Sequence, residues 1–415
     1  MKNILSSRTN IIIPAILLWI AFVIMIPSCS DGSAGRLHGW DLDETTTGIG
    51  STGISLPLYI PPDDEIESGT WYVPAGSKIT GKRIKTGGVV LDAGGITFRQ
   101  CLFRPTSIGR GMPLLHGSGP ETNLIMDCEI DGSLIDPTVH TGLGTSIAIS
   151  AGNIRVEGCN IHHFGSGVAF HGSDPVVLRA CYIHHLVDTE YNPGDWSHTD
   201  GFTIRGFSGA GAIIENNRID AHNGHCTGAV FLQATWDDSF YDNIAFEGNL
   251  LEGNGYNLMI ERSNGAYGAN IRAVNNRFNV QGYGVGYVDH GPGWAEWRRN
   301  FLNNPHRKGN RGAPAPEPMT QGAAGLAAPG NLTASAAPGG TITLSWSDNS
   351  ADELGFKIMR SIDGAFFDSL TIVDADSVSY ADTGLTAGTT YYYRIAAVND
   401  EGISDFSNSV NAEAQ

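Results

Sequence analysis

A short segment recurs along the middle of the chain, a Cys or Asn followed two positions later by an aliphatic residue or Phe. Its spacings of 22 to 36 residues fit coils of three short strands, with the excess of the longer coils as loop. Alternating runs such as 167–170 and 201–204 indicate one strand in each coil with one face inward. A repeat of this kind predicts a solenoid of stacked coils. The recurring residues are Cys101, Cys128, Cys159, Cys181, Asn217, Asn249, Asn276 and Asn300.

In stacked coils these Cys and Asn residues fall on one column, with neighbours about 4.8 Å apart. Each Asn can then hydrogen-bond its neighbours above and below, which predicts an internal ladder. The spacing is within reach of a disulfide, but parallel side chains suit that bond poorly. We therefore predict buried free thiols with a structural role. Cys226 lies off the column, and the sequence assigns it no role.

Over residues 56–308 the pattern resembles right-handed parallel β-helix proteins of the pectate-lyase-like kind. Residues 309–328 are rich in Pro, Ala and Gly and predict a linker. Residues 329–415 resemble a fibronectin type III domain, with Trp346 in an early strand. The resemblance implies that Trp346 is a core residue and that Tyr391 forms a tyrosine corner. The predicted fold class is all-β, a right-handed parallel β-helix solenoid followed by a fibronectin type III β-sandwich.

Residues 1–28 predict export. Lys2 and Arg8 precede an apolar run at 11–26, and Ile-Pro-Ser-Cys at 26–29 resembles a bacterial lipobox. The resemblance implies a lipid on Cys29, and thus a cell-envelope lipoprotein that meets the membrane only through this anchor. A membrane-anchoring helix or a plain signal peptide with secretion are the alternatives. Residues 29–55 are polar and aperiodic and predict a tether.

The formal net charge of −18 argues against nucleic acid as a partner, because its binding needs a basic surface. A few arginines in one groove can still hold an anionic glycan. We therefore expect an extracellular polysaccharide as the partner and a monomeric protein.

The alternating strands predict a polar stripe on the outer face of the solenoid, with aromatic residues beside it that could stack on sugar rings. The alternative is an ordinary solvated face. The predicted stripe is Ser150, His171, Arg205, Gln233, Glu261 and Asp289, and the predicted stacking floor is Phe231, Met259 and Tyr287. The predicted substrate-binding residues are His171, Tyr191, Phe231, Gln233, Arg262 and Tyr287.

One coil leaves the repeat for an acidic and aromatic loop at 186–199 and returns through His-Thr-Asp-Gly-Phe-Thr-Ile at 198–204. This return resembles the Asn-Thr-Asp-Gly-Ile-Asp-Ile motif of polygalacturonases, which implies that Asp200 is a catalytic carboxylate. The paired aspartates of that family would fall on Thr227 and Gly228, so the mechanism does not carry over. The alternative is a structural Asp200 that caps the turn into the strand.

The first mechanism that we predict is β-elimination on a uronic acid. His198 is the predicted base. The predicted acid is Tyr191 or Tyr256, and the predicted counter-charge for the substrate carboxylate is Arg205 or Arg262.

Calcium could supply this positive charge in place of an arginine, because hard oxygen ligands cluster in the loop. These ligands are Asp188, Glu190 and Asp195, with Asp200 nearby. The chain has no lysine from 86 to 307, which excludes a lysine base in that span. A protein without any cofactor is the alternative.

Hydrolysis is the second mechanism. Glu261 and Asp289 would lie on adjacent coils about 4.8 Å apart, close to the separation in retaining glycosidases. Asp200 could also take part. A third possibility is a non-catalytic surface protein that binds glycan through Phe231, Tyr287 and the neighbouring Trp236, Trp294 and Trp297.

A second column follows the ladder and includes the repeated pairs His162-His163 and His184-His185. Two His flanked by Asp could hold a metal, or they could be rim residues that hydrogen-bond each other. The column comprises Arg104, Asp131, His162, His184, Asp220 and Glu252.

Overall fold

The computed structural model describes residues 37–49, 69–109, 112–140, 142–192, 194–207, 211–234, 240–241, 243–262, 266–267, 270–288, 293–318, 326–364, 367–399 and 402–415. Cys29 and the predicted signal sequence lie outside these ranges, and so do Trp236 and Asp289. Among the described residues, no helix has the length and apolar character that crossing a membrane requires.

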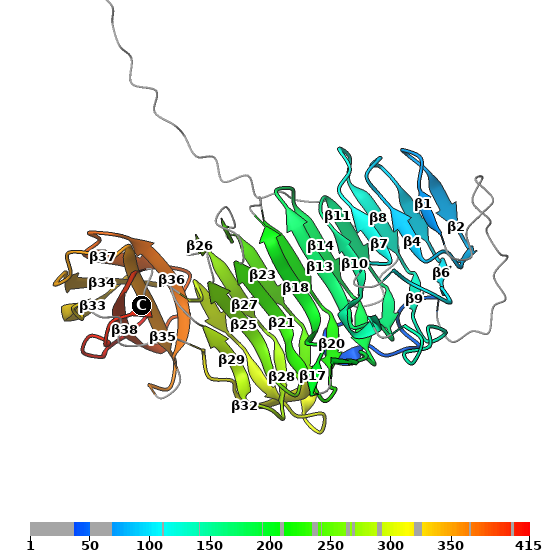
Figure 1. Cartoon of the computed structure of the whole chain (residues 1–415). Helices are drawn as coiled ribbons and strands as arrows, with labels where there is room; N and C mark the ends of the chain where they lie inside the picture. Colours follow the sequence, from blue (N-terminus) through cyan, green and yellow to red (C-terminus); the bar gives the residue numbers. More distant parts are fainter. Residues whose placement is uncertain are drawn as a thin grey trace, which may run out of the picture. The chain divides into compact units, whose positions relative to one another are not determined.

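The solenoid has three parallel sheets along its sides, and each coil contributes one strand to each sheet in the same order (Figure 1). The first sheet contains β1 (Thr70–Tyr72), β4 (Gly88–Val90), β7 (Leu115–Gly117), β10 (Ile147–Ala151), β13 (Ser166–Gly172), β18 (Thr199–Phe207), β21 (Cys226–Ala234), β25 (Tyr256–Arg262) and β29 (Gly284–Val288). The second sheet contains β2 (Lys78–Thr80), β5 (Thr97–Arg99), β8 (Asn123–Met126), β11 (Ile154–Glu157), β14 (Val176–Arg179), β19 (Ala212–Glu215), β23 (Ile244–Glu247), β27 (Ile271–Val274) and β30 (Glu296–Arg298).

The third sheet contains β3 (Arg83–Ile84), β6 (Leu102–Phe103), β9 (Glu129–Asp131), β12 (Asn160–His162), β15 (Tyr182–His184), β20 (Arg218–Ala221), β24 (Leu250–Gly253), β28 (Arg277–Val280), β31 (Phe301–Asn303) and β32 (Arg311–Pro314), of which β32 is antiparallel to β31. The described residues also contain two small added sheets and three short 3-10 helices. These are β16 (Glu190–Asn192) with β17 (Asp195–Trp196), β22 (Phe240–Tyr241) with β26 (Ala266–Tyr267), η1 (Gly39–Asp41), η2 (Leu143–Thr145) and η3 (Lys308–Asn310).

The turn from the second to the third sheet explains the repeat. From β5 onward, a single residue of left-handed conformation follows each second-sheet strand, and the buried Cys or Asn comes next. The Oδ1 atom of Asn249 accepts a hydrogen bond from the backbone N–H of Asn217 at 2.9 Å, while its Nδ2 donates to the carbonyl of Ile214 at 2.9 Å. The predicted ladder is therefore confirmed. The left-handed residues are Gln100, Asp127, Gly158, Ala180, Asn216, Gly248, Asn275 and Arg299.

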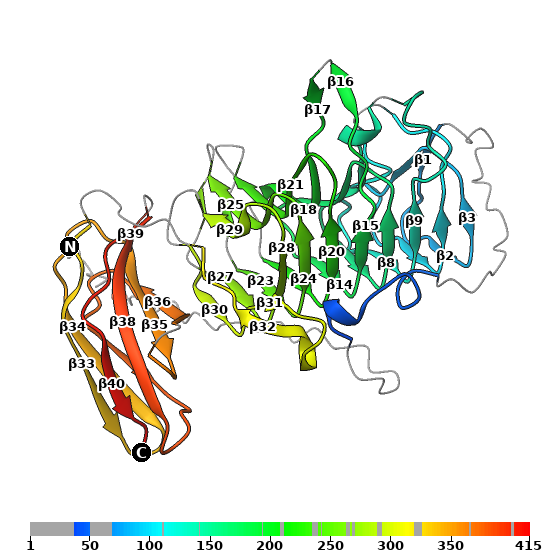
Figure 2. The ribbon, with the colours of Figure 1, turned by 90° about the horizontal axis from the view of Figure 1, so that it is seen from below.

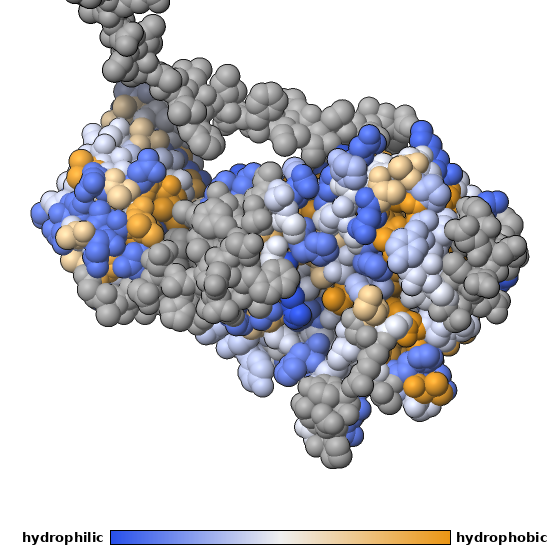
Figure 3. All heavy atoms as spheres, turned by 45° about the horizontal axis from the view of Figure 1, so that its top comes forward, coloured by the Kyte–Doolittle hydropathy of each residue, from blue (hydrophilic) through white to orange (hydrophobic). Residues whose placement is uncertain are grey.

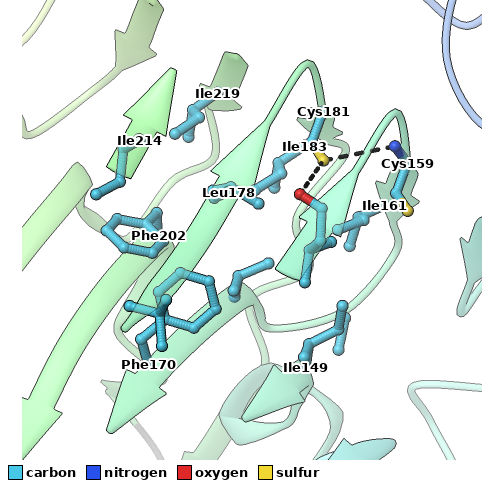
Figure 4. Packing of buried hydrophobic residues seen from close by; sticks show 14 of the residues in the cluster. Ile149, Cys159, Ile161, Phe170, Leu178, Cys181, Ile183, Phe202, Ile214 and Ile219 are labelled. Atoms are coloured by element: carbon cyan, nitrogen blue, oxygen red, sulfur yellow. Dashed lines mark hydrogen bonds between the residues drawn. The ribbon is translucent and has the colours of Figure 1, made fainter. Parts of the chain in front are cut away.

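The four ladder cysteines are buried and free, as predicted. The backbone N–H of Cys159 donates to Cys181 Sγ at 3.4 Å, so the thiol takes the place of an Asn oxygen (Figure 4). Burial raises the pKa of the Cys128 and Cys159 thiols well above the ordinary range, which keeps them protonated and unreactive. Cys226 is half-buried at the start of β21.

Inward side chains of the three sheets fill one continuous core. Phe170 and Phe202 meet edge to face at 5.3 Å in the middle of it (Figure 4). Near its C-terminal end the core takes in Trp294 and Trp297, which are 0% and 1% exposed. Their interpretation as glycan-binding residues is therefore wrong, because the sugar could not reach them.

Residues 37–49, which we call the N-terminal strap, belong to the segment predicted as a tether but contact the solenoid. The strap runs along the turns beside the third sheet (Figure 2). The N–H of Gly39 donates to the carbonyl of Gly248 at 2.9 Å, and the N–H of Gly48 donates to the carbonyl of Gly158 at 2.7 Å. Gly48 has a φ of 68°, and a Cβ there would lie 2.7 Å from the Cβ of Asn160. Glycine therefore permits the close approach.

The segment predicted as a linker also has structure in its first part. The strand β32 pairs with β31, and the carbonyl of Ala315 accepts a hydrogen bond from Trp297 Nε1 at 3.1 Å. Glu317 is buried in an ion pair with Lys357 of the C-terminal domain. Lys357 also donates to the carbonyl of Trp294 at 2.7 Å. The buried charges thus have hydrogen-bonded partners, as burial requires.

The C-terminal domain is a sandwich of two antiparallel groups of strands. One contains β33 (Gly330–Ala337), β34 (Thr341–Ser347) and β37 (Ser379–Asp382), and the other contains β35 (Gly355–Ser361), β36 (Asp368–Asp374), β38 (Thr390–Asn399), β39 (Gly402–Ile403) and β40 (Val410–Glu413). Trp346 is buried, and Tyr391 accepts a hydrogen bond at its hydroxyl from the N–H of Thr386 at 3.2 Å. The predicted core tryptophan and tyrosine corner are confirmed.

The ladder leads to a first prediction. Replacement of Asn249 by Ala would leave the N–H of Asn217 and the carbonyl of Ile214 buried without partners. Each such group costs about 1–3 kcal/mol, so we expect a loss of roughly 2–5 kcal/mol in the free energy of unfolding, measured by urea denaturation. The matched control is Asn270→Ala, because Asn270 is exposed. Equal stability of the two variants would contradict the structural role of the ladder.

Candidate functional site

The strand β18 carries two of the predicted catalytic residues, and the structure brings their side chains together. Asp200 lies near its start and is 3% exposed. Arg205 lies near its end, half-exposed, and its Nη2 atom is 3.7 Å from Asp200 Oδ2. Because five positions of strand separate the two residues, the Arg205 side chain must run back along the strand to reach Asp200.

The environment of Asp200 favours a proton on its carboxyl group. Burial raises the pKa of Asp200 to about 7, and the nearby Arg205 offsets this only in part. Among the described residues, Oδ1 of Asp200 has no hydrogen-bond partner. A carboxyl that titrates near neutral pH is suited to acid–base chemistry or to control of a neighbouring charge.

The packing around Asp200 explains which residues flank it in the sequence and on the neighbouring strand. A Cβ on Gly201 would lie 2.2 Å from Ile219 Cγ2 and 2.6 Å from the carbonyl oxygen of Ala229, so only glycine fits after Asp200. On the neighbouring strand Asp200 faces Gly228, which has no side chain, and Gly228 in turn faces Tyr256. The backbone N–H of Asp200 donates to Ser166 Oγ at 3.2 Å, which holds the start of the strand.

His198 lies two residues before Asp200 and is exposed. Its Nδ1 atom is 3.5 Å from Thr227 Oγ1 on the neighbouring coil. Asp200 contacts the Arg205 guanidinium, and His198 lies two residues before Asp200 in the chain; we call these three residues the β18 site. The sequence predicts all three members of the β18 site.

A pocket of 370 Å³ opens over β10, β13 and β18, and Arg205 is the one member of the β18 site that lines it. Its polar side chains are those of Ser150, His171 and Arg205. The predicted substrate-binding His171 therefore shares a pocket with Arg205. Gln233 and Glu261 continue the column of Arg205 on β21 and β25, where both are half-buried. Ser150 pairs with Ala169 and so lies in the neighbouring column, which corrects its place in the predicted stripe. Figure 3 shows hydrophilic and hydrophobic residues mixed over the visible surface of the solenoid.

The loop at 186–199 forms a hairpin of β16 and β17 that stands out from the solenoid (Figure 2). Trp196 at its base is 36% exposed and stacks on His225, with ring centroids 4.5 Å apart. His225 Nδ1 is 2.6 Å from Asp188 Oδ2. The sequence predicted neither Trp196 nor His225 as site residues, because their stacking joins two different coils.

The predicted calcium ligands have separate partners. Asp188 pairs with His225, whereas Glu190 Oε1 accepts a hydrogen bond from the N–H of Gly194 at 2.5 Å. The side chain of Asp195 lies outside the described residues, and so do the side chains of Tyr191 and Arg262. Calcium therefore stays a prediction, and so does the pair of Glu261 with Asp289, since Asp289 is not described.

A tyrosine cluster lies at the C-terminal end of the first sheet. The ring of Tyr256 is 5.5 Å from Tyr287 and 5.6 Å from Tyr283. Tyr283 is 80% exposed and Tyr287 is 37% exposed, so the cluster offers ring faces to solvent. Sugar rings stack on such surfaces through their apolar faces.

The rest of the predicted stacking floor is wrong. Phe231 and Met259 are outward but only 6% and 9% exposed, and Thr203 on the next strand is 2% exposed. The three face one another in register across β18, β21 and β25. Side chains on strands about 4.8 Å apart cover one another in this way, so an outward residue is not always accessible.

The comparisons with known proteins agree with this architecture. Residues 115–302 match the family model of the right handed beta helix region, and residues 327–413 match that of the fibronectin type III domain. The protein is therefore an all-β chain in which a right-handed parallel β-helix precedes a fibronectin type III domain. These two domains form a scaffold of the carbohydrate-active or surface-protein type.

Two similar solved structures each match a part of the chain. A Fn3-like protein from Clostridium thermocellum is 26% identical, with a TM-score of 0.20, and the match covers 22% of this chain and 96% of that one. A beta-1,2-glucanase from Parabacteroides distasonis is 26% identical, with a TM-score of 0.21, and the match covers 25% of this chain and 14% of the glucanase. No curated protein matches the chain.

The raised pKa of Asp200 leads to a second prediction. Between about pH 4 and pH 7 the folded protein keeps a proton that the unfolded chain has released. This stabilising contribution is complete below pH 4 and is lost as the pH rises through 7. We expect the free energy of unfolding to fall by up to roughly 4 kcal/mol over this range in the native protein, and to change less in Asp200→Asn. Urea denaturation at several pH values measures this difference.

The control for this prediction is Asp174→Asn, since Asp174 is exposed. It should retain the pH dependence of the native protein. A native-like pH dependence in Asp200→Asn would show that Asp200 titrates as an ordinary carboxylate.

Proposed function

We propose that the protein cleaves an extracellular polysaccharide that contains uronic acids, by β-elimination at the β18 site. The observation that carries this proposal is the contact between the half-exposed Arg205 and the buried Asp200. At neutral pH a large fraction of Asp200 is uncharged, so the positive charge of Arg205 is only partly compensated. Arg205 can then pair with the carboxylate of a uronic acid in the adjacent pocket.

The reaction removes the proton on C5 of the uronic acid and breaks the C4–O bond to the leaving sugar. A C4=C5 double bond forms, and the leaving oxygen takes a proton. The charge on Arg205 stabilises the negative charge that develops on the carboxylate. His198 is the proposed base, because it is exposed and an imidazole can accept a proton at neutral pH. Tyr191 or Tyr256 is the proposed acid.

The cellular location of this activity is part of the same proposal. An export signal with a lipid on Cys29 would hold the enzyme at the cell envelope, where polysaccharide substrates are found. The protein would act as a monomer. The negative net charge of the chain limits electrostatic attraction to the few exposed arginines, so an anionic glycan would bind at Arg205 rather than over the whole surface.

A third prediction tests the reaction. The purified protein is incubated with a panel of acidic and neutral polysaccharides, with and without calcium, while absorbance near 235 nm and reducing ends are recorded. We expect both signals to rise with an acidic substrate. Arg205→Ala and His198→Ala should each lose at least about a hundredfold in kcat/KM, since each removes one part of the transition-state stabilisation.

Arg272→Ala is the matched control, because Arg272 is an exposed arginine on the second sheet. It should keep full activity. Reducing ends without the absorbance change would replace elimination by hydrolysis, with Asp200, Glu261 and Asp289 as the carboxylates to test. Activity unchanged in Arg205→Ala would contradict the β18 site.

Glycan recognition without cleavage is a second candidate function, and the tyrosine cluster favours it. Tyr283 and Tyr287 present exposed rings side by side with Tyr256. If this surface binds glycan, Tyr283→Ala with Tyr287→Ala should weaken binding about tenfold, measured by calorimetry. Full binding by this double variant would exclude the cluster as the recognition surface.

A further inference from the structure

Four histidines form a compact cluster on the third sheet, on the side where the N-terminal strap passes. His162 ends β12 and His184 ends β15, and these residues face each other in register. Each is followed by a second histidine, His163 or His185. The rings of His162 and His184 stack at 5.0 Å, and those of His163 and His185 stack at 5.4 Å. We call these four residues the histidine cluster.

The backbone turns the second histidine of each pair toward the first. His163 has a φ of 62° and His185 a φ of 49°, a conformation that non-glycine residues rarely adopt. The corresponding residues on the flanking strands, Gly132 and Ala221, are not left-handed. The unusual conformation thus occurs only where the paired histidines occur, in the described part of the third sheet.

The nitrogen atoms within each pair converge. His162 Nδ1 is 2.6 Å from His163 Nδ1, and His184 Nδ1 makes an equally close approach to His185 Nδ1. Two imidazole nitrogens that bind one tetrahedral ion lie about 3.3 Å apart, because each metal–nitrogen bond is about 2.0–2.1 Å. A small rotation of the rings would therefore admit an ion between the two nitrogens of a pair.

Hydrogen bonds orient the rings of His162 and His184 so that Nδ1 of each ring faces Nδ1 of the following histidine. His162 Nε2 is 3.0 Å from Glu129 Oε1, and His184 Nε2 is 2.8 Å from Asn160 Oδ1. The amide of Asn160 is oriented by its own donation to Glu129 at 3.2 Å. Each Nε2 therefore donates a proton to an oxygen, which leaves the lone pair on Nδ1. Metal-binding histidines are held by outer partners in the same manner.

Each pair also has a carboxylate at ligand distance. Asp131 joins His162 and His163, and Glu44 joins His184 and His185, so that the ligand atoms of each group lie within 4.8 Å of one another. Asp131 Oδ1 is 3.4 Å from His162 Nδ1, while its Oδ2 is held by Arg104. A pocket of 240 Å³ opens over the cluster. Imidazole-rich sites of this composition suit zinc and neighbouring transition metals, not calcium or magnesium.

From this geometry we propose that each pair of the histidine cluster binds a divalent first-row transition-metal ion, with Asp131 as the oxygen ligand of the first pair and Glu44 as that of the second. Glu44 belongs to the N-terminal strap, whereas the other ligands belong to the solenoid. Metal binding would thus fasten the strap to the third sheet. The anchors of the strap at Gly39 and Gly48 already bring Glu44 to the site. This inference is independent of the β18 site, which lies on the first sheet.

Zinc uptake tests the proposal directly. The full-length protein, purified without a histidine tag and stripped with EDTA, is dialysed against zinc chloride, and bound zinc is measured by atomic absorption. The double variant His163→Asn with His185→Asn removes two imidazoles but keeps a residue that tolerates the left-handed backbone. We expect the native protein to retain zinc and the double variant to lose at least tenfold in affinity. Circular dichroism confirms that the variant is folded.

His306→Asn is the matched control, because His306 is exposed in a turn away from the cluster. It should bind zinc like the native protein. Equal zinc binding by the double variant and the native protein would overturn the proposal, and so would the absence of zinc from the native protein.

Hydrogen exchange of the strap gives a second readout, which does not depend on any enzymatic activity. Zinc should slow amide exchange in residues 37–49 of the native protein, and Glu44→Gln should remove most of this protection because the strap then lacks its ligand. Exchange of residues 37–49 that is unaffected by zinc would contradict the role of Glu44.

Discussion

The stacking of coils through main-chain hydrogen bonds is the constraint on which the rest of this structure depends. It requires that successive coils make the same turn between the second and third sheets, with a buried residue after the turn from Cys101 onward. One left-handed residue and one buried Cys or Asn meet that requirement. Because the ladder also binds the backbone of each coil to the next, the register of all three sheets follows from it.

Because the register is fixed, residues that are far apart in sequence lie opposite each other on neighbouring strands. On the first sheet it sets Asp200 opposite Gly228, so a carboxyl is buried beside a strand that has no side chain at that position. On the third sheet it sets His162 opposite His184 and so doubles the local number of imidazole nitrogens. In both places the neighbouring strands hold polar side chains, the Asp200 carboxyl and the imidazoles, in an environment that an isolated strand would not provide.

The repeat made the fold predictable, because the ladder leaves a direct mark in the sequence. The sequence placed Asp200 and Arg205 on one strand but did not predict the contact between their side chains. The reach of the Arg205 side chain back to Asp200 depends on rotamers, which sequence periodicity does not specify. The accessibility of Phe231 was mispredicted because alternation gives the direction of a side chain and not what covers it. The strap at residues 37–49 lacks periodicity, so only its contacts with the solenoid reveal that it is packed.

The central functional claim is that Arg205, held by Asp200, receives the carboxylate of an anionic sugar. A crystal structure with a bound uronic-acid oligosaccharide tests it most directly. A sugar carboxylate should lie within hydrogen-bond distance of the Arg205 guanidinium, with His198 near C5 of the same sugar. An oligosaccharide bound over Tyr283 and Tyr287 instead, with Arg205 still facing only Asp200, would exclude Arg205 as the carboxylate-binding residue.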